Sequence, residues 1–143
     1  EIVKTMALGS CVGVIMLDPG VMAVGMLHVA LPDSSINKSR VSERPGMFAD
    51  TGIPILIDEM KKLGCDINGK IIVKLAGGAS IMDPNNTFNI GKRNVLAIRK
   101  ILWKYKLGPI AEDIGDAISR TVTVYVDTGK VTLSSPGRGE WEL

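Results

Sequence analysis

The fold is decided by residues 12–31, VGVIMLDPGVMAVGMLHVAL. Two apolar runs in this stretch flank Asp18-Pro19-Gly20, a trio typical of a turn, so the stretch predicts a β-hairpin. Both faces of each predicted strand are apolar, as expected where a sheet is buried on both sides. The hairpin therefore predicts a sheet that is covered by other layers above and below.

The chain beyond the hairpin alternates between helical and strand patterns. Apolar residues at helical spacing predict helices over about residues 50–63 and 90–106, and Gly64 follows the first as a left-handed cap. Because Pro54 is acceptable only in a first turn, the first helix is expected to start late. Further strands are predicted over residues 70–76, 110–114, 121–126 and 130–134. This order predicts an α/β layered sandwich with a mixed, largely antiparallel sheet and two main helices.

Length and composition predict one domain that spans residues 1–143. A chain of 143 residues that is 45% hydrophobic can bury a substantial core. The longest apolar runs, residues 12–17 and 21–27, are far shorter than the ~20 residues that cross a bilayer, so no membrane insertion is expected. Two cysteines do not make the disulfide framework of a small secreted domain, which favours the cytoplasm.

Composition also bears on ligands. A net charge of +2 and an aromatic content of 4% provide little for binding nucleic acid, which is not expected as a partner. The single histidine and two distant cysteines offer none of the usual zinc spacings. Neither a metal nor another cofactor is therefore expected.

Hairpin geometry relates Cys11 to His28. If Pro19-Gly20 forms a two-residue loop, or if residues 18–21 form a four-residue loop, Cys11 lies opposite His28. Directly opposed residues of antiparallel strands share a face, with Cβ atoms ~4.5–5.5 Å apart. Pro-Gly turns match the twist of a hairpin poorly, so a bulge that shifts this register by one residue is the alternative.

A histidine beside a cysteine suggests nucleophilic chemistry. The thiolate is the reactive form, and a free cysteine with a pKa of ~8.5 is mostly protonated at neutral pH, so an imidazole that takes the proton activates it. Gly9 permits a tight backbone path before Cys11, and the N–H groups of Ser10 and Cys11 are candidate donors to an oxyanion. The alternatives are a small buried cysteine and a structural histidine, both common in proteins.

Six blocks of the sequence resemble, in order, the chemoreceptor glutamine deamidases of the CheD family. These blocks are TMALGSC at 5–11, HVALPD at 28–33, FADTG at 48–52, AGGAS at 76–80, NIGKRN at 89–94 and AEDIG at 111–115. The resemblance implies hydrolysis of the side-chain amides of particular receptor glutamines to glutamate and ammonia. It also implies a layered α/β sandwich.

The resemblance assigns roles to individual residues. The family's nucleophilic cysteine falls on Cys11, its histidine on His28 and the threonine of its triad on Thr5. It implies methyl-accepting chemoreceptors as substrates and a CheC-type phosphatase as a further partner. Two alternatives stay open: a docking module without catalysis that binds receptors or the phosphatase, and hydrolysis of receptor methylesters by the same nucleophile. Residues 116–119 depart from the family pattern, which bears on recognition more than on chemistry.

Three further residues are candidates for positioning the substrate. Gly77-Gly78 follows a predicted strand without the Lys-Ser/Thr of a phosphate-binding loop, so a tight turn beside the site is expected. Asp33 is a candidate for contact with the substrate, although an aspartate after a proline more often caps a turn.

Overall fold

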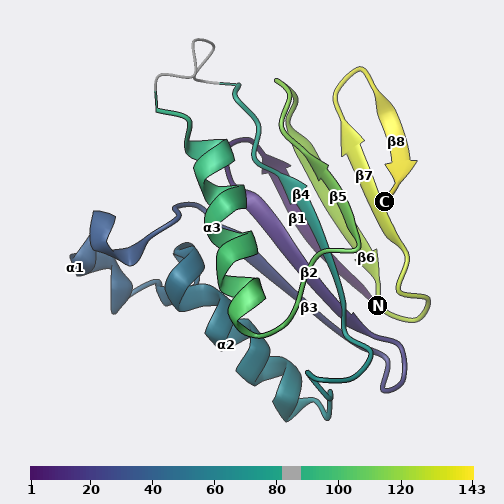
Figure 1. Cartoon of the computed structure of the whole chain (residues 1–143). Coiled ribbons are helices and arrows are strands. Elements are labelled where there is room, and N and C mark those ends of the chain that lie inside the picture. Colours follow the sequence, from purple (N-terminus) through teal and green to yellow (C-terminus); the bar gives the residue numbers. More distant parts are fainter. Residues whose placement is uncertain (82–87) are drawn as a thin grey trace.

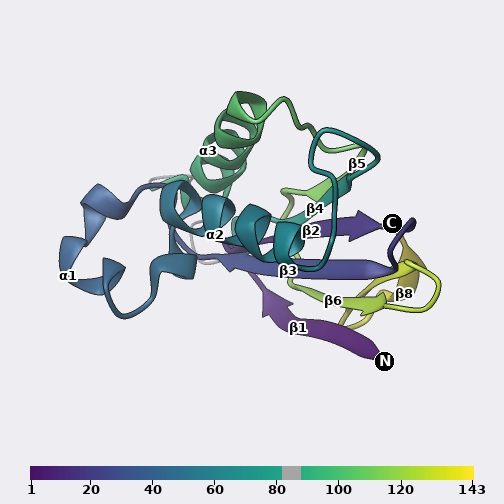
Figure 2. The ribbon, with the colours of Figure 1, turned by 90° about the horizontal axis from the view of Figure 1, so that it is seen from below.

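A computed structural model describes residues 1–81 and 88–143, which form helices packed on two stacked sheets (Figures 1 and 2). The first sheet has the strand order β1-β6-β7-β8 and the second has the order β3-β2-β4-β5. The strands are β1 (Ile2–Leu8), β2 (Val12–Asp18), β3 (Ala23–Val29), β4 (Ile72–Gly77), β5 (Ala111–Ile114), β6 (Arg120–Tyr125), β7 (Val131–Ser135) and β8 (Gly139–Glu142).

The helices cover one face of the second sheet. The two long helices are α2 (Ala49–Lys62) and α3 (Ile90–Lys104). Three short helical segments precede them: η1 (Ser34–Ile36), α1 (Lys38–Val41) and η2 (Pro45–Met47). Figure 2 shows the resulting layers of helix, sheet and sheet. The predicted α/β layered sandwich is thus confirmed, with two sheets; only the β4–β5 pair is parallel among the described strand pairs.

Strand β2 lies at the centre of both cores, as its unbroken apolar sequence predicted. Val14 and Met16 pack with residues of α2 and α3 in one cluster. Ile15 and Leu17 pack against β6 and β7 in the other cluster. Full burial of such a side chain contributes about 1.5–3 kcal/mol, so both clusters depend on this strand. The prediction that the hairpin is covered on both sides is confirmed.

The hairpin register differs from the prediction by two residues. Gly13, and not Cys11, pairs with His28, and the loop closes at the Asp18–Ala23 pair. The reason lies in the turn: the Asp18 carboxylate accepts the Gly20 N–H at 2.9 Å, and the following loop carries one residue, Met22, in the left-handed region. A shift of two residues keeps every side chain on its original face, because side chains alternate with a period of two.

Other differences concern the ends of elements. Strands β1 and β8 were not predicted, and α2 begins at Ala49, so Pro54 lies inside the helix rather than in its first turn. Pro54 lacks the N–H that would bond to the carbonyl of Asp50. Gly64 does end this helix with φ +92°, as predicted. None of the helices in the described ranges is long and apolar enough to cross a membrane.

Candidate active site

A hydrogen bond joins the two sheets at the edge where β1 and β3 lie. Thr5 on β1 and His28 on β3 contact each other through Oγ1 and Nδ1 at 3.0 Å. β1 is the first strand of its sheet and β3 is the first strand of the other, so the bond links two edge strands. When Nδ1 carries the ring proton, the Thr5 hydroxyl accepts a hydrogen bond from it. The second ring nitrogen, Nε2, then keeps a free lone pair.

Gly13 lies beside this contact. It pairs with His28, and a Cβ at this position would lie 3.3 Å from Cδ1 of Leu8 and 3.9 Å from Cγ2 of Thr5. β1 also contains an irregularity between Thr5 and Leu8, where Ala7 has φ +52° and donates its N–H to Oγ1 of Thr121. The local bulge changes the course of β1 just after Thr5.

Cys11 lies just before β2 and faces the same layer as His28. The half-buried side chain of Cys11 packs against the apolar cluster between the two sheets. His28 alternates along β3 with Leu27 and Val29, which face the helices, and it therefore shares the sheet-facing side with Met26. The thiol and the imidazole thus project into the same interface, as the hairpin argument predicted, although the two residues are not directly paired.

Burial shifts both titratable groups toward their neutral forms. Desolvation raises the pKa of the Cys11 thiol, and a hydrogen bond from its own backbone N–H offsets part of that rise. Desolvation lowers the pKa of the His28 imidazole. The resting pair at neutral pH is therefore a thiol and a neutral imidazole, which is able to accept a proton.

The backbone around Cys11 is fixed by three successive carbonyls. Those of Gly9 and Cys11 accept the N–H groups of Ala79 at 2.8 Å and Gly78 at 2.9 Å. The carbonyl of Ser10 accepts the side-chain amide of Asn94 at 2.9 Å. In a trans peptide the C=O and N–H groups point in opposite directions. The N–H of Ser10 therefore points away from Ala79, and the N–H of Cys11 points away from Asn94.

Gly77 and Gly78 are required by close backbone contact where β4 ends. Gly77 has φ +115°, and a Cβ there would lie 2.3 Å from the carbonyl oxygen of Cys11. Gly78 has φ +66° and lies against Gly91 of α3, where a Cβ would be 2.4 Å from the Gly78 oxygen. A methyl group at Gly77 would push residues 9–11, here called the cysteine loop, away from β4, and one at Gly78 or Gly91 would push the end of β4 away from α3.

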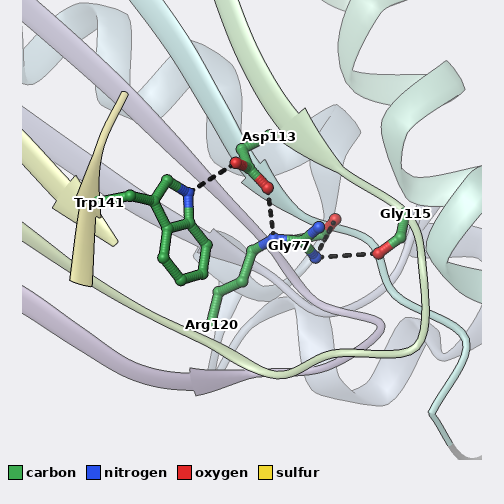
Figure 3. Close-up of polar contacts among 5 residues, drawn as sticks. All are labelled: Gly77, Asp113, Gly115, Arg120 and Trp141. Carbon is green, nitrogen blue, oxygen red and sulfur yellow. Dashed lines mark hydrogen bonds and ion pairs between the residues drawn. The ribbon is translucent and has the colours of Figure 1, made fainter. Parts of the chain in front are cut away.

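A buried arginine holds the end of β4 from the other side (Figure 3). Arg120 is 1% exposed; its Nε donates to Asp113 Oδ1 at 2.8 Å and its Nη1 donates to the carbonyls of Gly77 and Gly115. The indole of Trp141 donates to the other Asp113 oxygen at 2.8 Å. This network joins strands of both sheets. It reaches the cysteine loop through Gly77, which pairs with Val12, the residue after Cys11.

The remaining residues of interest lie around this centre. Asp33 caps η1 by accepting the Ser35 N–H at 2.8 Å, and its exposed carboxyl has a lowered pKa because of that hydrogen bond. A surface hollow of about 560 Å³ beside His28 is lined mostly by apolar residues together with Arg44. Cys65 is buried near Asp18, and desolvation raises the pKa of its thiol.

The sequence reasoning missed Asn94 and the Asp113–Arg120 ion pair as supports of the site. A signal existed for Asn94, because it falls on the apolar stripe of α3 beside Val95 and Ile98. A polar residue at such a position requires hydrogen-bond partners, and these partners are in the cysteine loop. No pattern in the sequence marked the ion pair.

A thiol and an imidazole that share one face, with a hydroxyl on the imidazole, are the parts used by enzymes with a cysteine nucleophile. A sequence model of the CheD family, described as CheD chemotactic sensory transduction, matches residues 30–135. The probable chemoreceptor glutamine deamidase CheD of Syntrophotalea carbinolica is 54% identical over 144 residues, covering 100% of this chain and 89% of the relative. The chemoreceptor glutamine deamidase CheD of Thermotoga maritima is 39% identical over 139 residues, covering 97% and 85%. The chain belongs to the CheD family.

Proposed function

We propose that this chain is a glutamine deamidase that converts side-chain amides of chemoreceptor glutamines to glutamate and ammonia. The observation that carries the proposal is the Thr5–His28 hydrogen bond, which orients the only histidine of the chain on the face that Cys11 shares. Relatives named chemoreceptor glutamine deamidases cover the segment that contains all three residues. The proposal treats residues 1–143 as one catalytic domain that works in the cytoplasm.

The proposed reaction begins from the neutral pair. His28 accepts the thiol proton of Cys11, and the sulfur attacks the amide carbonyl carbon of the glutamine. The resulting imidazolium protonates the amide nitrogen and the C–N bond breaks. Ammonia departs, and the glutamine side chain remains bound to Cys11 as a thioester. The histidine then takes a proton from water, whose oxygen attacks the thioester. The C–S bond breaks, the imidazolium returns its proton to the sulfur, and glutamate and the free thiol are released.

The backbone next to the thiol supplies candidates for stabilising the oxyanion. The bonds to the Gly9 and Ser10 carbonyls set the directions of the Ser10 and Cys11 N–H groups, which point away from Ala79 and from Asn94. Loss of one such donor costs about 2.7–4 kcal/mol in known enzymes. Gly9 precedes these donors. Gly77 and Gly78 lie against the backbone of Cys11.

Thr5 orients the histidine. Its hydroxyl accepts a hydrogen bond from Nδ1–H and thereby leaves Nε2 to exchange a proton with the thiol. A hydroxyl stabilises the imidazolium less than a carboxylate does, so its removal reduces the rate without abolishing it.

The hollow beside His28 is the proposed approach for the receptor. Its apolar lining, which includes Met26 and Met47, suits the surface of a helical segment, and Arg44 adds a cation. Asp33 stays in the proposal as a residue that positions the substrate indirectly, by capping η1. A CheC-type phosphatase is proposed as a further partner from the family resemblance.

The test is conversion of glutamine to glutamate in a fragment of a chemoreceptor helical bundle, followed by mass spectrometry. Wild type and the matched variant Cys65→Ala, which changes the other cysteine, are expected to convert the fragment, whereas Cys11→Ala is not. Conversion by Cys11→Ala would remove the mechanism. Binding without conversion would favour the docking module, and loss of methyl groups from a methylated fragment without deamidation would favour the esterase.

A further inference from the structure

The side chain of Asn94 connects the two halves of the candidate site. Its Nδ2 donates to the carbonyl of Ser10 at 2.9 Å and to the carbonyl of Ala30 at 3.1 Å. Ser10 immediately precedes Cys11, and Ala30 follows His28 by two residues. One amide nitrogen thus bonds to the backbone that carries the sulfur and to the backbone that carries the imidazole.

The chemistry of the partners fixes the orientation of this amide. Both partners are carbonyl oxygens, which only accept, so the nitrogen and not the oxygen must face them. The Asn94 side chain is fully buried, and its Oδ1 has no hydrogen-bond partner within the described residues. The two donated hydrogen bonds, and not the oxygen, are thus the contacts that tie this side chain to the site.

Helix α3 provides a rigid base for the contact. Gly91, one turn before Asn94, lies against Gly78, and Gly78 donates its N–H to the carbonyl of Cys11. Ile98, one turn after Asn94, is fully buried in the core between the helices and the sheet. The asparagine therefore projects from a part of α3 that is packed on both sides.

We infer that Asn94 is a positioning residue that sets the distance between the Cys11 thiol and the His28 imidazole. The inference rests on the proposed function, since the two groups must exchange a proton. A displacement of about 1 Å in such a pair can cost 100-fold in rate. Removal of the amide is accordingly expected to lower kcat about 10- to 100-fold, with KM changed by less than about threefold because the hollow beside His28 does not include Asn94.

The first experiment compares Asn94→Ala with Leu102→Ala, two turns further along α3. Both changes truncate a fully buried side chain of α3, and both are expected to lower Tm, but only Asn94 contacts the two carbonyls. With the receptor fragment as substrate, and below the unfolding range, Asn94→Ala is expected to lose kcat while Leu102→Ala keeps it. Equal losses in the two variants, or wild-type kcat in Asn94→Ala, would overturn the inference.

The second experiment measures coupling without the receptor. Alkylation of Cys11 by iodoacetamide is followed near neutral pH in wild type, Asn94→Ala, His28→Ala and the double variant. If Asn94 places the thiol against the imidazole, His28→Ala slows alkylation severalfold in wild type and much less in the Asn94→Ala background. Additive effects would contradict the positioning role.

This readout also separates the two proposals, because coupled alkylation in a chain that does not deamidate glutamine refutes only the proposed function. If Asn94→Ala does not fold, Asn94→Asp retains the shape of the side chain. Its carboxylate cannot donate to either carbonyl, whereas its protonated form donates to one of them. The kcat of this variant relative to wild type is expected to rise as the pH is lowered, and a ratio that stays at one across the pH range would overturn the inference.

Discussion

The Thr5→Val substitution isolates the contribution of the threonine hydroxyl, because valine keeps the shape and the β propensity of threonine. The hydroxyl lies 3.0 Å from Nδ1 of His28 and is the histidine partner that the geometry identifies. A hydrogen bond to a charged group contributes about 1.5–3 kcal/mol, which corresponds to about a 10- to 150-fold effect on rate. Because this bond lies at an exposed edge, the loss of kcat is expected near the lower limit, about 10-fold.

The assay is the steady-state rate of glutamate formation in a receptor fragment, measured by mass spectrometry for wild type, Thr5→Val, Thr5→Ser and Cys11→Ala. Thr5→Ser keeps the hydroxyl and is expected to stay within severalfold of wild type. Cys11→Ala is expected to be inactive. A Thr5→Val variant with wild-type kcat, or one as inactive as Cys11→Ala, would refute the orienting role.

Three other predictions concern the thiol, the glycine turn and the buried ion pair. Iodoacetamide should alkylate Cys11 faster as pH rises, with a midpoint above that of an unperturbed cysteine, because burial raises the thiol pKa; a lower midpoint would contradict the neutral resting pair. Gly77→Ala should lower the free energy of unfolding in urea by about 3 kcal/mol or more, whereas Gly115→Ala, which has φ +82° and open space, should cost about 1–2 kcal/mol. Asp113→Ala should cost about 3 kcal/mol in the same titration because it leaves Arg120 buried without its carboxylate, and a loss below 1 kcal/mol would show that the carbonyls suffice.

Most of the fold could be predicted because its signals are local. The hairpin, both long helices and the strands after them have periodic patterns and turn residues of their own. β1 lacked such a signal, because most of its residues are exposed at the edge of a sheet, and β8 is a short polar strand. The division of the strands into two sheets depends on pairings between distant segments, such as β1 with β6, which no local pattern reveals.

The sequence could predict which face of the sheet the site residues share, but not which atoms they contact. Residue parity placed Cys11 and His28 on one face, and that result survives the two-residue error because a shift of two preserves the face. The error came from Met22, a residue type that gives no indication of a left-handed conformation. The two carbonyls that Asn94 joins come from segments far apart in the chain, so their contact follows from tertiary packing alone.

The central claim, that Cys11 forms a thioester with the receptor glutamine, is tested most directly by the mass of the intact chain during turnover. Acid quenching of wild type with a receptor fragment, followed by peptide mapping, should locate an adduct on Cys11 whose mass equals the fragment less ammonia. The adduct should be absent from Cys11→Ala. An adduct on another residue, or full conversion of the fragment by Cys11→Ala, would contradict the account.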